Sequence, residues 1–169
     1  MAHDDPTAEV TEVLQAFIRN ACVNDGTADS GEEVRSADLV TNYLEGTGLD
    51  LEYYEPHAGR RSVLAKIEGS DPNAPGLMLM GHTDVVPVDR QSWYGNPFEL
   101  DERDGRLYGR GSADMKSFVA IVLAFAPEFA RRGLRQPLHI ALSYDEEVGC
   151  IGVGRLIADL EIAGIRPDA

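Results

Sequence analysis

The architecture follows from one stretch of the chain, Leu77–Asp84, which reads LMLMGHTD. It starts directly after Pro75-Gly76 with four apolar residues in a row, a pattern typical of a strand covered on both faces. Its last residues include an imidazole and a carboxylate, so polar chemistry begins where the strand ends. A second apolar run, Leu138–Leu142, is followed by the acidic pair Glu146-Glu147. We therefore expect two buried strands whose carboxyl ends both carry polar side chains.

Helical periodicity marks two segments in front of these strands. Apolar residues recur at helical spacing over Val10–Ile18, and the preceding Asp5-Pro6 is typical of a helix start, with the aspartate as cap. The sequence Ser30–Glu33 matches a capping box, which predicts a second helix with an apolar face over Val34–Leu44. We expect both helices to pack on the sheet.

The remaining segments alternate between strand and helix patterns. Strand-like alternation occurs over Leu49–Tyr53 and Val63–Ile67, and Asp104-Gly105 is a hairpin signal. A helix is expected from about Met115 to Ala126, where the following proline should kink or end it, and a last helix over Val153–Leu160. Strand, crossover helix, strand and helix in this order predict an α/β fold, a mainly parallel sheet sandwiched by helices. Without repeats or linkers, residues 1–169 are expected to form one folding unit.

Composition narrows the classes of partner. The formal net charge of −14 argues against nucleic acid, because phosphate binding needs clustered Lys and Arg, and it disfavours anionic membrane surfaces. No apolar run approaches the roughly 20 residues that a membrane span needs. The cytoplasm is therefore the expected location. Cys22 and Cys150 are too few and too far apart for a disulfide framework or a zinc knuckle.

Three polar clusters are expected to meet at one edge of the sheet. His82 and Asp84 follow the first buried strand, Glu146 and Glu147 follow the second, and Asp114 stands at the turn that opens the helix between them. In open parallel sheets, ligands bind outside the carboxyl ends of the strands. One imidazole with four carboxylates is a ligand set that suits zinc, cobalt or manganese. The sequence therefore predicts a metal site.

Each residue type has a physical task in such a site. Asp84, two residues after His82, can accept the second N–H of the imidazole and fix its tautomer. Asp114 has two carboxylate oxygens and could bridge two cations about 3.5–4 Å apart. The adjacent Glu146 and Glu147 should not point the same way in extended chain, so one can bind metal while the other acts as general base towards a water.

Simpler interpretations compete with this one. A lone His-x-Asp after a strand is a weak signal, and acidic pairs are common. The pair Glu32-Glu33 is expected to cap a helix, and Asp101-Glu102 to lie in a solvated loop. His139 lies inside an apolar run with no acidic neighbour in sequence. The three clusters at matching strand ends favour the metal site over these readings.

Three ordered motifs resemble those of one family of dinuclear zinc enzymes. They are Gly81–Pro87, Gly109–Lys116 and Ser143–Cys150. The family comprises acetylornithine deacetylase, succinyl-diaminopimelate desuccinylase, aminoacylase and the glutamate carboxypeptidases. The resemblance spans nearly the whole chain. In the last motif it is strongest to acetylornithine deacetylase, whereas Val23–Thr27 and Glu55–His57 look more like broad carboxypeptidases of the same group.

The resemblance implies a role for each candidate residue. His82 would ligate one metal, Glu147 the other, and Asp114 would bridge both. Asp84 would support His82, and Glu146 would be the general base. The cofactor would be two Zn²⁺ ions per complete site, with Co²⁺ or Mn²⁺ possible. The resemblance also implies a strained, cis peptide bond between Asp114 and Met115, which would aim the bridging carboxylate.

The resemblance further implies a substrate, and it implies which part of the parent enzyme residues 1–169 form. The activity would be hydrolysis of the amide bond of an N-acyl amino acid, first of all N-acetylornithine in arginine biosynthesis. A dipeptide or N-succinyl-diaminopimelate is the alternative, and the full-length parent would be a homodimer. Residues 1–169 would form the N-terminal part of the catalytic domain, without the dimerisation domain and without the family's two further ligands. We therefore expect weak metal binding and little turnover, and a catalytically inactive metal-binding fragment is the alternative from another class.

Overall fold

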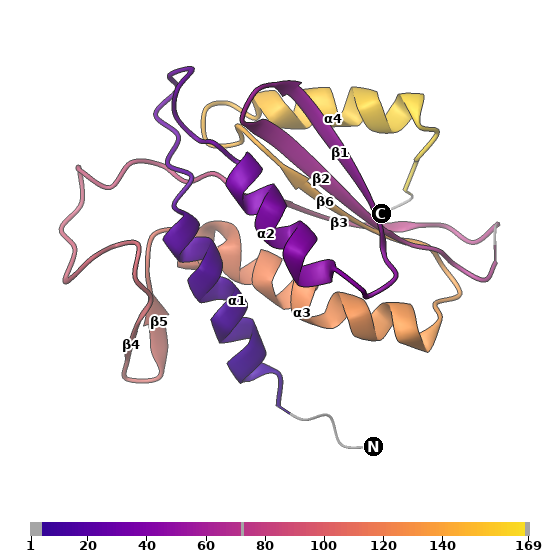
Figure 1. The fold of residues 1–169 in the computed structure, drawn as a ribbon, viewed down its shortest axis with the longest axis horizontal. Coiled ribbons are helices and arrows are strands. Elements are labelled where there is room, and N and C mark those ends of the chain that lie inside the picture. Colours follow the sequence, from indigo (N-terminus) through magenta and orange to yellow (C-terminus); the bar gives the residue numbers. More distant parts are fainter. Residues whose placement is uncertain (1–4, 72, 168–169) are drawn as a thin grey trace.

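The structure is a computed structural model and describes residues 5–71 and 73–167. A four-stranded sheet lies at its centre, with three helices on one face and one on the other (Figure 1). The α/β class with a helix-flanked sheet is thereby confirmed. In spatial order the strands are β1 (Asp50–His57), β2 (Arg60–Ile67), β6 (Leu138–Ser143) and β3 (Leu77–His82). The helices are α1 (Thr7–Asn20), α2 (Val34–Leu44) and α3 (Ser117–Arg132) on one face and α4 (Ile151–Ile162) on the other.

The prediction of a mainly parallel sheet is wrong for this part of the chain. Only β3 and β6 pair in parallel, whereas β2 pairs antiparallel with both β1 and β6. The cause is the length of the connections. Only Ala58-Gly59 separates β1 from β2, and so short a loop can join only antiparallel strands. The long crossover through α3 allows β3 and β6 to run in parallel.

The core forms two layers because successive strand residues face opposite sides of the sheet. Val63 and Ala65 of β2 pack with helices α1, α2 and α3, whereas Leu64 between them packs towards α4. Phe17 of α1 and Leu123 of α3 are fully buried in the first layer. These contacts fix the carboxyl ends of β3 and β6 relative to the helices.

Strand β3 lies at the edge of the sheet, and its expected cover on both faces is incomplete. Leu77 and Met80 remain 45% and 38% exposed, whereas Gly81 and His82 at its end are buried. Within the described residues β6 is its one strand neighbour. An apolar run in the sequence indicates that a strand is suited to burial. It does not indicate which other segment packs against that strand.

Two predictions about helix ends differ from the structure. Ser30 Oγ contacts the Asp25–Thr27 loop, accepting from the Asp25 N–H at 3.2 Å, and Glu33 is buried, so the predicted capping box does not form. Helix α3 continues through Pro127 to Arg132, because packing across the proline holds the last turn, with the Phe125 and Phe129 rings stacked at 6.1 Å. Asp5 does cap α1, accepting the Thr7 N–H at 3.0 Å.

The predicted hairpin is present outside the main sheet. Strands β4 (Asp101–Arg103) and β5 (Arg106–Tyr108) pair antiparallel across Asp104-Gly105. Both turn residues have positive φ, 52° and 69°, as a two-residue turn of this kind requires. The pair Asp101-Glu102 is exposed, as expected, and lies on a strand. In the described part of the chain, no helix combines the length and apolar character needed to cross a membrane.

Candidate metal centre

Three separate segments meet where β3 and β6 end. His82 is the last residue of β3 and stands in register with Ser143, the last residue of β6. Asp114 belongs to the short π-helical segment η1 (Ser112–Lys116), and Glu147 follows β6 in a turn. One potential ligand atom each from His82, Asp114 and Glu147 lies within 4.8 Å of the others. The predicted ligands are therefore brought together.

The His82 ring is oriented by the chain that follows it. Its Nδ1 is 3.1 Å from the carbonyl oxygen of Asp84 and 3.4 Å from the Asp84 carboxylate. Nε2 is left to face the cluster, 3.2 Å from Asp114 Oδ1 and 3.6 Å from Glu146 Oε2. Burial lowers the pKa of His82, but hydrogen bonds to Asp84 and Asp114 outweigh it and raise the pKa to about 9. Nε2 therefore lies where positive charge is favoured.

Asp114 lies in an irregular stretch of backbone, and its side chain reaches His82 from a largely exposed position. The Asp114–Met115 peptide bond is cis, as predicted, and both residues depart from helical φ and ψ. The Asp114 side chain is 78% exposed. Two residues on, the fully buried Lys116 donates from Nζ to the carbonyls of Phe17 at 2.8 Å and Ala21 at 2.7 Å, which anchors the segment to the end of α1.

The two glutamates occupy a turn and not the extended chain that the sequence interpretation assumed. Asp145 before them has a φ of 48°, and the N–H groups of Glu146 and Glu147 donate to the two Asp84 oxygens at 3.2 and 3.1 Å. In this turn both carboxylates reach the cluster. Glu146 Oε2 lies near His82, and Glu147 belongs to the ligand group. Burial raises the pKa of Glu147.

Sequence reasoning missed four polar residues behind the ligands. Asn24 donates to Asp84 at 3.0 Å and to Asp145 at 2.7 Å, and Arg60 forms an ion pair with Glu33 at 3.1 Å. Glu33 was assigned to a helix cap instead. Partners that lie 27 residues apart leave no local signal in a sequence. For Asn24 the only available signal was its place in a segment resembling the carboxypeptidases.

An open cleft of about 740 Å³ adjoins the cluster. Glu147 and Asn24 line one part of it, and Pro87, Asp89 and Arg90 line another. The space is large enough for a small molecule and lies directly beside a predicted ligand.

The fold recurs in solved structures of peptidases. Human carnosine dipeptidase 1 matches with a TM-score of 0.77 and 23% identity over 92% of this chain and 36% of its own. A metallo-carboxypeptidase of the M20 family from Sulfolobus solfataricus matches with a TM-score of 0.78 and 20% identity over 95% of this chain and 36% of its own. A dinuclear metal-binding peptidase of that family from Bacillus subtilis matches with a TM-score of 0.61 and 19% identity over 94% of this chain and 42% of its own. Identities this low show a common fold, and the chain spans little more than a third of the first two.

The family follows from the sequence match. Residues 78–169, more than half of the chain, match the model of peptidase family M20/M25/M40. The chain therefore belongs to this peptidase family. The resemblance seen in the three motifs is confirmed at the level of the family.

Proposed function

We propose that His82, Asp114 and Glu147 are ligands of a centre for two divalent cations in a peptidase that hydrolyses the amide bond of a small substrate. The observation that supports this proposal is the convergence of their ligand atoms within 4.8 Å, from three segments of the chain. The ligand atoms of these three residues fit divalent metal ions. An imidazole nitrogen with carboxylate oxygens suits Zn²⁺, Co²⁺ or Mn²⁺.

The residues would divide the work as follows. Asp114, whose side chain is largely exposed and carries two carboxylate oxygens, would bridge the cations, with His82 and Glu147 as private ligands. When bound, the cations would polarise the scissile carbonyl and lower the pKa of a water molecule. Glu146, whose carboxylate lies 3.6 Å from His82 Nε2, would take the proton of the attacking water and return it to the leaving amine. Asp84 would hold the His82 ring through Nδ1.

Two substrate classes have support. Structures that cover about nine-tenths of this chain include human carnosine dipeptidase 1 and a dipeptidase from Saccharomyces cerevisiae, which favours a dipeptide. The motif Ser143–Cys150 resembles acetylornithine deacetylase, which favours N-acetylornithine. The cleft of about 740 Å³ beside Glu147 has room for either. We propose a dipeptide or N-acyl amino acid, with further ligands from outside residues 1–169 in a homodimeric, cytoplasmic parent enzyme.

Metal titration of the 169-residue chain tests the centre. We expect the chain to bind Co²⁺ weakly, with visible absorption, because only one private ligand and the bridge hold each ion. Asp114→Ala should lower the affinity at least about tenfold, since loss of even an outer supporting group costs 10–100-fold. The exposed Asp101 on β4 is the matched control, and Asp101→Ala should bind as the wild type does.

Hydrolysis of a dipeptide and of N-acetylornithine is followed on the same samples. Turnover is expected to be low, to favour one of the two substrates, and to vanish in Glu146→Gln while Co²⁺ binding persists. No Co²⁺ binding by the wild type, or binding that survives both His82→Ala and Asp114→Ala, would overturn the proposed function.

A further inference from the structure

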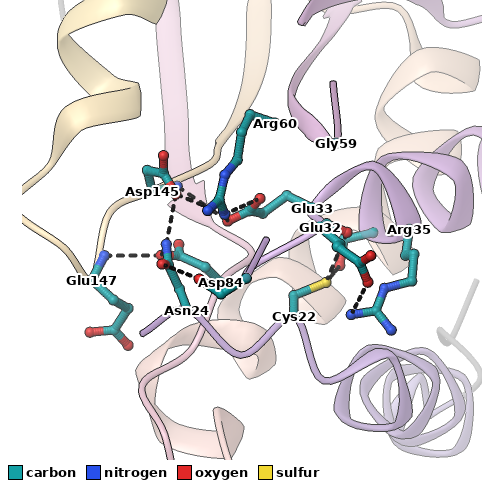
Figure 2. Close-up of polar contacts among 12 residues, drawn as sticks. Cys22, Asn24, Glu32, Glu33, Arg35, Gly59, Arg60, Asp84, Asp145 and Glu147 are labelled. Atoms are coloured by element: carbon teal, nitrogen blue, oxygen red, sulfur yellow. Dashed lines mark hydrogen bonds and ion pairs between the residues drawn. The ribbon is translucent and has the colours of Figure 1, made fainter. Parts of the chain in front are cut away.

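A buried chain of polar side chains leads to Asp84, and the proposed function assigns no task to the members behind Asp84 (Figure 2). Arg60 Nη1 donates to both Glu33 oxygens at 3.1 Å and lies 2.9 Å from Asp145 Oδ1. The same Asp145 oxygen accepts from Asn24 Nδ2 at 2.7 Å, and Asn24 Nδ2 also donates to Asp84 at 3.0 Å. A continuous path of hydrogen bonds and one ion pair, that between Arg60 and Asp145, therefore connects Glu33 to Asp84.

The charges on this path are deeply buried and unequal in number. The side chains of Glu33 and Asp84 are fully buried, and those of Arg60 and Asp145 are 9% and 14% exposed. Glu33 and Asp145 share the guanidinium of Arg60, and Asp84 contacts His82 instead. Oxygens of Glu33, Asp84 and Asp145 approach one another closely enough to hold a metal ion, but Arg60 Nη1 already lies among them. The cation of this cluster is therefore the arginine.

Arg60 is enclosed by close neighbours. Its Nη2 donates to the carbonyl of Thr27 at 3.0 Å, so the guanidinium is held on two sides. Gly31 covers it closely, and a Cβ at that position would lie 1.7 Å from Arg60 Nη1. The planar, fixed fork of an arginine suits this position, whereas a lysine would supply charge without the same set of donors.

The path ends on the groups that form the candidate centre. Asp145 directly precedes Glu146 and Glu147, whose N–H groups donate to Asp84. Asp84 also contacts His82 Nδ1. The positions of Asp145 and Asp84 therefore set the turn that carries the proposed base and one proposed ligand.

We propose that Arg60 is a positioning residue of the metal centre. Its guanidinium holds Asp145 directly and Asp84 through Asn24, and thereby aims the turn of residues 145–147 at the cations. Without Arg60, the buried carboxylates of Glu33 and Asp145 would lose the positive partner that they share, and like charges at such distances repel strongly. The inference rests on the proposed function.

The test compares Arg60→Lys with a matched control on the same strand. Arg61 is the next residue, and its ion pairs with Asp38 and Glu55 lie nearer the surface. In the metal-free chain, hydrogen exchange of the Glu146 and Glu147 amides reports whether the turn is held. We expect Arg60→Lys to speed this exchange at least about tenfold relative to that of the core amides of α3 in the same chain, and Arg61→Lys to leave this ratio unchanged.

Co²⁺ binding is the second measurement. Arg60→Lys should weaken Co²⁺ binding by about 10–100-fold, the usual cost of losing an outer supporting group, and should alter the absorption spectrum. If Arg60→Lys does not fold, Asn24→Ala cuts the same path without removing a charge and should show both effects.

The outcomes separate the two proposals. A wild-type chain that binds no Co²⁺ refutes the proposed function, and amide exchange then still decides whether Arg60 holds the turn. A wild-type chain that binds Co²⁺, with Arg60→Lys indistinguishable from Arg61→Lys in exchange and affinity, refutes the positioning role alone.

Discussion

The candidate centre has two halves that are built in opposite ways. In the buried half, the Asp84 side chain has no exposed surface and contacts Asn24, His82 and the N–H groups of Glu146 and Glu147. In the open half, the Asp114 side chain is 78% exposed, and the Glu146 side chain is 34% exposed. The carboxylates of the open half have few protein partners.

We therefore expect the two halves to be stabilised in different ways, the buried half by protein contacts and the open half by a bound cation. The buried half is satisfied by the protein itself, so its geometry exists before any cation arrives. The open half gathers like charges at the ends of β3 and β6, and such charges gain most from a cation between them. Substitutions in the buried half should therefore damage the fold, and those in the open half should damage metal binding.

The largest expected effect is that of Asp84→Ala. The change removes one of two acceptors of the Asn24 amide and the shared acceptor of two backbone N–H groups, and it breaks the contact of the buried Asp84 carboxylate with His82. Loss of one partner of a buried pair costs about 3–5 kcal/mol in free energy of unfolding. Urea denaturation of the metal-free chain measures this loss, and Asp114→Ala should leave the midpoint nearly unchanged. Equal losses in both variants would contradict the comparison.

Zinc should stabilise the chain through the open half. A ligand that binds only the folded state adds about 2.7 kcal/mol when its concentration is 100 times its Kd. The melting temperature should therefore rise with Zn²⁺ and return to its starting value with a chelator. The Asp114→Ala variant should respond much less. A response that persists in this variant would place the bound zinc elsewhere.

A smaller effect tests how tightly the buried half is packed. Gly31 and Gly46 have φ values of 79° and 74°, so alanine is strained to a similar degree at both. A Cβ at Gly31 would collide with Arg60, whereas a Cβ at Gly46 meets nothing within 4 Å. Gly31→Ala should therefore cost about 1–3 kcal/mol more than Gly46→Ala in urea denaturation, the usual cost of overpacking. A difference near zero would show that Arg60 can shift freely.

The same division explains what the sequence could predict. His82, Asp114 and Glu147 follow recognisable strands and turns, so periodicity and position placed them at one edge, and the motifs gave the cis bond before Met115. The buried half depends on contacts between distant segments. Glu33 stands in a sequence that matches a capping box, and only the approach of Arg60 from the β1–β2 hairpin makes it an interior carboxylate.

For the sheet, the positions of the strands could be predicted from the sequence, but not all of their directions. Alternation and apolar runs located the strands, because burial patterns are local. Strand direction depends on connection length, and the short β1–β2 loop was not recognised as a hairpin. Pro127 was expected to kink or end α3, but the helix continues to Arg132, and the packing around the proline is absent from any local pattern.

The smallest expected effect lies away from both halves, at His139 of β6. It stands between Lys66 of β2 and Met78 of β3, and its Nδ1 has no hydrogen-bond partner among the described residues. Burial lowers the pKa of His139. The unfolded chain takes up this proton near pH 6.5 and the folded chain only at a lower pH, so stability falls as the pH drops below 6.5.

His139→Leu removes this titration and isolates its contribution. We expect the free energy of unfolding of the wild type to fall relative to that of the variant between about pH 7 and pH 5, whereas the two should run in parallel at higher pH. Urea denaturation at several pH values measures the difference. His82 titrates in both chains, so its opposite contribution cancels when the two curves are subtracted. Curves that stay parallel throughout would show that His139 is protonated in the folded chain as readily as in the unfolded one.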